Sequence, residues 1–79
     1  MARQKQWRIL FTFHTTTQAM KMEACATQRQ KAGRLIPIPG EISAGCGLAW
    51  MAPLSQKEDL KEFLLGEHIE TEGEYELFM

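Results

Sequence analysis

The residue best suited to chemistry is Cys46, which stands between Gly45 and Gly47. Glycine on both sides removes the side chains that would shield the sulfur, and it permits backbone angles that other residues avoid. A cysteine that only fills a core does not need such neighbours, so the pattern favours a thiol that another molecule can approach. The alternative is a small buried residue at the start of a strand, because free cysteines are among the most buried residue types.

Other residues could assist this thiol. A thiolate is favoured by nearby cations or oriented N–H groups, and Arg34 and Lys31 are the nearest basic residues in this half of the chain. Consecutive amides around residues 44–47 could also form an anion-binding nest. His14 is either a general base or a plain loop histidine that faces solvent. Cys25 has an alanine on each side within a predicted helix, which is typical of a buried structural cysteine.

Length and composition exclude several classes of protein. The chain has 79 residues, which predicts one domain over residues 1–79. A formal net charge of −1 argues against a nucleic-acid partner. No apolar run suits a signal peptide or a membrane span, so we expect a cytoplasmic protein without a membrane partner. The two cysteines form neither Cys-x-x-Cys nor a compact Cys/His cluster, so we expect no metal, no structural disulfide and no cofactor.

The apolar pattern predicts four strands and two helices. Alternating or continuous apolar runs place the strands at Trp7 to Phe13, Arg34 to Ile38, Gly47 to Met51 and Tyr75 to Met79. Capping boxes at Thr15–Gln18 and Ser55–Glu58 predict where the helices begin. Gly33 and Gly66 predict where the chain leaves each helix through a left-handed residue.

The order strand, helix, strand, strand, helix, strand predicts an α+β, ferredoxin-like βαββαβ fold. This fold has a four-stranded antiparallel sheet with two helices on one face. Pro37 and Pro39 lack amide protons on the same side of their strand, so this strand should lie at an edge of the sheet. The last strand should lie antiparallel to the first, where Arg8 would face Glu74 or Glu76.

Several short runs carry a family resemblance. They are Phe13-His14-Thr15, Ala19-Met20-Lys21 with Glu23, Leu35-Ile36-Pro37-Ile38-Pro39, Glu41-Ile42-Ser43 and Cys46-Gly47-Leu48-Ala49. Over most of the chain these runs resemble the selenium/sulfur carrier-like family of small bacterial domains. The most specific part is Ile-Pro-x-Pro-x-Glu-Ile-Ser-x-x-Cys-Gly. The resemblance implies that Cys46 is the chalcogen-carrying thiol, with supporting roles for Glu41, Ser43, Gly45, Gly47, His14 and Arg34.

The function implied by this resemblance is that of a carrier without turnover of its own. Cys46 would take sulfur as a persulfide, or the selenium analogue, from a donor of the cysteine desulfurase type and pass it to an acceptor protein. The alternative is a non-catalytic regulatory or protein-binding module. Its contact surface would be the Cys46 loop and the acidic edge formed by Glu72, Glu74 and Glu76, which is otherwise a solvated strand face. A homodimer is compatible with either function.

Overall fold

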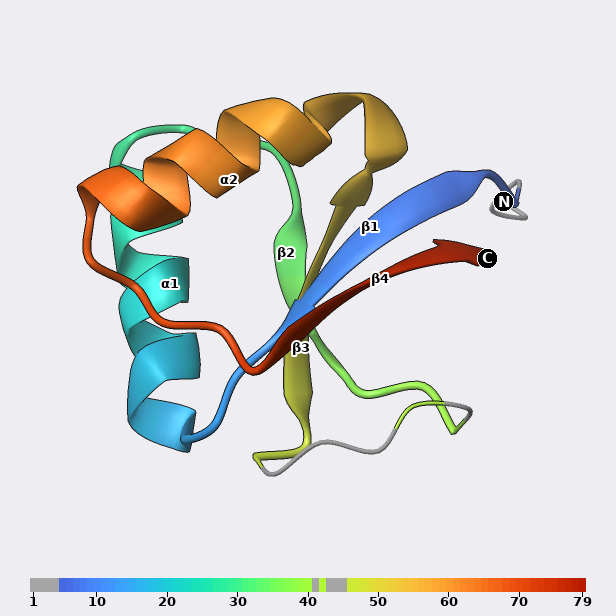
Figure 1. Ribbon diagram of the computed structural model, residues 1–79, viewed down its shortest axis with the longest axis horizontal. Helices are drawn as coiled ribbons and strands as arrows, with labels where there is room; N and C mark the ends of the chain where they lie inside the picture. Colours follow the sequence, from blue (N-terminus) through green and yellow to red (C-terminus); the bar gives the residue numbers. More distant parts are fainter. Residues whose placement is uncertain (1–4, 41, 43–45) are drawn as a thin grey trace.

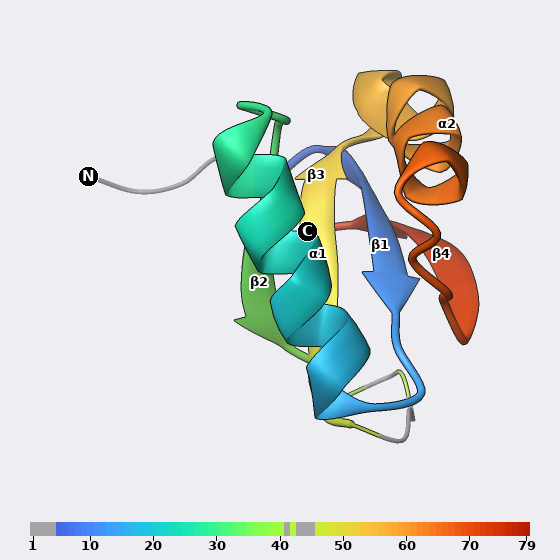
Figure 2. The ribbon, with the colours of Figure 1, turned by 90° about the vertical axis from the view of Figure 1, so that its left-hand side faces the viewer.

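The elements follow one another in the predicted order. Within residues 5–40, 42 and 46–79, which the computed structural model describes, the chain forms four strands and two α-helices. These are β1 (Trp7–Thr12), α1 (Thr16–Gln28), β2 (Arg34–Pro37), β3 (Leu48–Pro53), the short 3-10 helix η1 (Leu54–Gln56), α2 (Lys57–Gly66) and β4 (Gly73–Phe78). The sheet order is β2-β3-β1-β4 with every pair antiparallel. Both helices lie on one face of the sheet (Figures 1 and 2), so the ferredoxin-like prediction is confirmed.

The main core lies between the sheet and the helices. Alternate residues of a strand point to the same face, and here Ile9 and Phe11 of β1 and Trp50 of β3 point toward the helices. The helices contribute Ala19, Met22, Ala26, Leu60, Phe63 and Leu64. The indole Nε1 of Trp50 donates to the Ala32 carbonyl oxygen at 3.0 Å, so the largest core side chain also ties β3 to the segment after α1.

The helix-free face of the sheet is also covered, which the sequence pattern did not predict. The alternation of apolar and polar residues in β1 is typical of a half-buried strand, but Leu10 and Thr12 are fully buried and Arg8 is only 9% exposed. Leu10 packs in a second cluster with Ala49, Met51 and Ile42. Ile42 comes from the segment between β2 and β3, so this segment supplies apolar cover to a face that no helix reaches.

The prolines lie as predicted at the sheet edge. Strand β2 pairs only with β3, which makes it an edge strand. The N–H of Ile38 donates to the Gly47 carbonyl oxygen at 3.0 Å, so it points toward β3. Successive residues of a strand direct their amides to opposite sides, and the nitrogens of Pro37 and Pro39 therefore face outward, where no hydrogen bond is lost.

One helix start agrees with the sequence and the other differs. The Thr15 hydroxyl oxygen accepts the Gln18 N–H at 3.2 Å, which confirms the cap of α1. The capping box predicted at Ser55 is wrong, because α2 begins after η1 and its N-cap, Gln56, makes no side-chain capping bond. Strand β3 runs on to Pro53, opposite Arg8 of β1, and the chain then enters η1 directly.

Neither helix leaves through the predicted glycine. The left-handed residues are Gln30, with φ 55°, and His68, with φ 57°. After each of them the next amide donates five residues back: Lys31 to Ala26 at 2.8 Å, and Ile69 to Leu64 at 2.9 Å. This is the Schellman motif, which satisfies carbonyls at the helix end even when the left-handed residue carries a side chain.

The register of β4 places its glutamates away from Arg8. Arg8 lies opposite Leu77, whereas Glu74 and Glu76 lie opposite Phe11 and Ile9. Residues directly opposite one another share a face of the sheet, so both glutamates lie on the helix side. The predicted Arg8–glutamate pairs are therefore wrong, since a shift of one residue in register changes the face on which a side chain lies.

Candidate functional site

Cys46 lies immediately before β3, on the side of the sheet that faces the helices. Cys46 and Leu48 both pack against the helix-side core that contains Trp50, in keeping with their spacing of two. The Cys46 side chain is half-buried, and its S–H donates to the Leu48 carbonyl oxygen with an Sγ–O distance of 3.5 Å. Because this bond uses the thiol proton, it is lost when the thiol ionises.

Gly47 shapes the turn that connects Cys46 to β3. Its φ is +76°, a conformation that L side chains rarely adopt, and a Cβ built there would meet nothing within 4 Å. The requirement for glycine is thus conformational and does not come from crowding. The space beside Gly47, the residue that follows the cysteine, is therefore open.

His14 and the start of α1 lie at the same end of the sheet as Cys46. Strand β1 is antiparallel to β3, and the ladder ends at the pair Thr12–Ala49. His14 lies two residues beyond Thr12, just as Gly47 lies two residues before Ala49, and His14 is exposed. Figure 1 shows the first turn of α1 and the residues that open β3 at the same end of the molecule.

Arg34 and Lys31 lie at the other end of the sheet. Arg34 is opposite Met51, three residues along β3 from Leu48, which corresponds to about 10 Å of extended strand, and Cys46 precedes that strand. The ammonium of Lys31 lies 3.1 Å from Asp59 and 5.4 Å from the centre of the Phe63 ring. The antiparallel register therefore separates both basic residues from the thiol that they were expected to assist.

The remaining predicted supporting residues are Glu41, Ser43 and Gly45, which lie outside the described residues. Between them, Ile42 is 9% exposed, and its N–H donates to the Pro39 carbonyl oxygen at 3.0 Å. Sequence reasoning did not identify Ile42 as the anchor of this segment. The sequence signal for its burial is that Ile42, in the Glu-Ile-Ser run, is an isolated apolar residue in a stretch rich in turn-forming residues.

Cys25 lies in the middle of α1, where it is half-buried and packs against the helix-side core. Its alanine neighbours had predicted a buried cysteine. In the structure Cys25 and Cys46 are both partly exposed. Both are free thiols. What distinguishes them is their backbone, which is a turn at Cys46 and a hydrogen-bonded helix at Cys25.

The acidic edge is partly neutralised within the chain. Lys57 of α2 lies 2.7 Å from Glu76 and 3.7 Å from Glu74, and Lys61 lies 3.6 Å from Glu74. The hydrogen bond to Glu76 raises the pKa of Lys57 above its ordinary value of 10.5. Glu74 and Glu76 thus join β4 to α2 while their side chains remain exposed, as expected of a solvated strand face.

The described part of the chain contains neither a metal-binding cluster nor a helix that could span a membrane. No group of three or more His, Cys, Asp or Glu side chains is arranged to hold a metal ion there. The helices in the same residues are too short or too polar to cross a bilayer.

Residues 8–76 match the family described as "Putative Se/S carrier protein-like". No curated protein matches the chain, and no solved structure does so either.

Proposed function

We propose that this chain, which belongs to the Se/S carrier protein-like family, carries one sulfur or selenium atom on Cys46. The observation that supports this most is the position of the thiol. Cys46 is half-buried in a turn, beside an open flank at Gly47, at the end of the sheet where α1 begins. Such a thiol can meet a partner cysteine without a deep pocket.

The backbone around Cys46 is suited to an anionic sulfur. The N-terminus of a helix carries a partial positive charge and unpaired N–H groups. The first turn of α1 contains no acidic residue that would cancel this charge. A thiolate or persulfide anion that comes close to this helix end would be in a favourable field, whereas Arg34 of β2 lies at the other end of the sheet.

The transfer step is an exchange between sulfur atoms. The Cys46 thiolate attacks the terminal sulfur of a donor cysteine persulfide, and a new S–S bond forms at Cys46 as the donor S–S bond breaks. The donor cysteine leaves as a thiolate. Transfer to the acceptor repeats this step with Cys46 as the leaving thiolate. The sulfane sulfur keeps its oxidation state throughout, so no external oxidant is needed, and selenium would follow the same course.

A loading assay tests this function. The reduced protein is incubated with a cysteine desulfurase and cysteine, and the intact mass is measured. The wild type and Cys25→Ser should each gain one sulfur atom, whereas Cys46→Ser should gain none because a hydroxyl cannot hold a persulfide. Repeating the assay with selenocysteine reports selenium loading. Equal loading of Cys46→Ser and the wild type would rule out Cys46 as the carrier residue.

The same variant separates the carrier from a protein-binding module. A carrier should keep its fold and its partner binding in Cys46→Ser and lose only sulfur acquisition. A contact surface would tolerate Cys46→Ser and would instead weaken, in a salt-dependent way, when Glu72, Glu74 and Glu76 are reversed. The ion pairs that Glu74 and Glu76 make with α2 favour the carrier, because those carboxylates already have cationic partners.

A further inference from the structure

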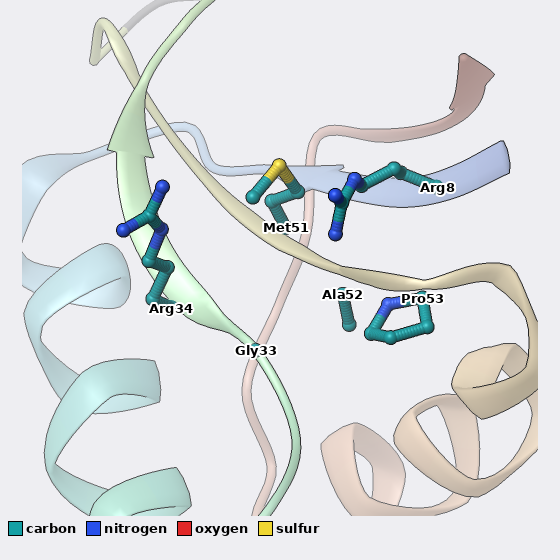
Figure 3. A pocket seen from close by; sticks show the side chains of 6 residues that line it. All are labelled: Arg8, Gly33, Arg34, Met51, Ala52 and Pro53. Atoms are coloured by element: carbon teal, nitrogen blue, oxygen red, sulfur yellow. The ribbon is translucent and has the colours of Figure 1, made fainter. Parts of the chain in front are cut away.

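A hollow of about 330 Å³ lies at the end of the sheet remote from Cys46. Its lining residues are Arg8, Gly33, Arg34, Met51, Ala52 and Pro53 (Figure 3). The hollow forms because β3 extends beyond the end of β2. The first pair of the β2–β3 ladder is Arg34–Met51, so Ala52 and Pro53 have partners in β1 but none in β2. At Gly33, where φ is +109°, the chain turns into β2.

Two arginines border this hollow on the helix-free face. Arg34 shares this face with Met51, which lies opposite it, and Arg8 shares it with Leu10, two residues along β1. In Figure 3 the two arginine side chains lie on either side of Met51. The lining contains no acidic residue, so the hollow has a positive field with an apolar floor.

Arg8 has the environment of a ligand-binding cation. It is only 9% exposed, and its Nε donates to the Met79 oxygen at 3.2 Å. Within the described residues neither Arg8 nor Arg34 forms an ion pair, whereas every ion pair there uses Arg29, Lys31, Lys57 or Lys61. Burying polar donors without acceptors is unfavourable, and an anion in the hollow would offer acceptors to the terminal nitrogens of Arg8 in addition to the bond that its Nε makes.

We propose that this hollow binds a small phosphate monoester. The planar guanidinium donors of arginine match phosphate oxygens in a bidentate fashion. The volume is at the lower end of the range for small-molecule sites, about 300–1,000 Å³, and it exceeds what a phosphate ion alone would fill. The partly exposed Pro53, with the edge of Met51 beside it, offers an apolar surface to the organic part of the ester. The site lies at the opposite end of β3 from Cys46, so it is separate from the carrier thiol.

The test is an NMR titration of the whole chain at constant ionic strength, with inorganic phosphate in one arm and glycerol phosphate in the other. We expect saturable shifts centred on the amides of Gly33, Arg34, Met51 and Ala52, and tighter binding of the ester. Shifts that scatter over surface lysines, or an ester that fails to bind, would overturn the proposal.

Variants sharpen this test. Arg34→Gln removes an exposed guanidinium that makes no hydrogen bond within the described residues. It should weaken binding of the phosphate ester by about tenfold or more, the range for losing a hydrogen bond to a charged group. Arg29→Gln is the matched control, since Arg29 pairs with Glu67 and lies outside the hollow. Arg8→Lys keeps the charge but loses the planar donors, and it should also weaken binding, with the fold checked by thermal unfolding. Unchanged affinity in both Arg34→Gln and Arg8→Lys would contradict the proposal, while Cys46→Ser should bind as the wild type does.

Discussion

Three glycines allow backbone strain and steric collision to be measured separately. Gly66 ends α2, has no positive φ and would meet nothing within 4 Å if it carried a Cβ. Gly47 has a φ of +76° in open space. Gly33 has a φ of +109°, and its Cβ would lie 2.5 Å from Trp50 Nε1, 3.0 Å from the Ala52 Cβ and in collision with the Met51 carbonyl oxygen. Alanine at Gly66 therefore adds neither strain nor a collision. Alanine at Gly47 adds backbone strain alone, and alanine at Gly33 adds both strain and a collision.

The expected free energies of unfolding follow from these differences. Gly66→Ala should stabilise the protein by about 0.4–1 kcal/mol, because it reduces the entropy of the unfolded chain. Gly47→Ala should destabilise it by about 1–2 kcal/mol, the cost of a left-handed conformation for an L residue. Gly33→Ala adds overpacking of about 1–3 kcal/mol to that strain, for a total of about 2–5 kcal/mol. A chain of this length has a stability of about 4–12 kcal/mol, so the last variant loses a large share of it.

Urea unfolding with a common m-value provides the measurement. The reasoning requires the order Gly66→Ala, wild type, Gly47→Ala, Gly33→Ala, from most to least stable. If Gly33→Ala were no less stable than Gly47→Ala, the close approach of the chain to β3 at Gly33 would be refuted. A changed m-value for Gly33→Ala would instead indicate an altered native or unfolded state.

Three further predictions follow from the loop, the thiols and α2. Ile42→Ala should lower the free energy of unfolding by about 2 kcal/mol, as for other truncations of buried isoleucine. It should also speed alkylation of Cys46. An unchanged urea midpoint would show that Ile42 does not stabilise the fold. Cys46 should be alkylated faster than Cys25 in the folded protein, because opening a turn costs less than opening a helix; equal rates by mass spectrometry would contradict this. The raised pKa of Lys57 implies stability that is fully present below pH 10.5 and is lost as pH rises through the folded-state pKa. Lys57→Met should therefore flatten the alkaline decline of the urea midpoint, and a steeper decline would contradict the pairing with Glu76.

Local backbone chemistry predicted two features correctly, although the capping box at Ser55 and the helix exits at Gly33 and Gly66 were wrong. Two prolines without amide protons were enough to place β2 at an edge, and the Thr15 hydroxyl was enough to place the start of α1. Features that depend on distant partners were not predicted. Nothing near Leu10 indicates that Ile42 will cover it, and Gly33 resembles a helix exit although its φ allows a close approach to β3.

The candidate site shows the same division. The glycines beside Cys46 are local, so the sequence could single out this thiol. Arg34 seemed close because it lies nearby in the sequence, but β2 and β3 run in opposite directions and place it opposite Met51, about 10 Å along β3 from Leu48. His14 is more distant in sequence, yet the pairing of β1 with β3 brings it to the same end of the sheet.

The pairing of β1 has a consequence for synthesis on the ribosome. Strand β1 emerges first, but its neighbours are β3 and β4, and the Gln6 and Met79 backbones exchange two hydrogen bonds of 3.1 and 3.0 Å. The apolar strand Trp7–Thr12 therefore has no sheet partner until most of the chain has left the exit tunnel. Closing such long loops costs entropy before any contact repays it, which slows folding. During that interval the nascent chain exposes the apolar residues of β1, so chaperones that bind extended hydrophobic segments should recognise the region around β1.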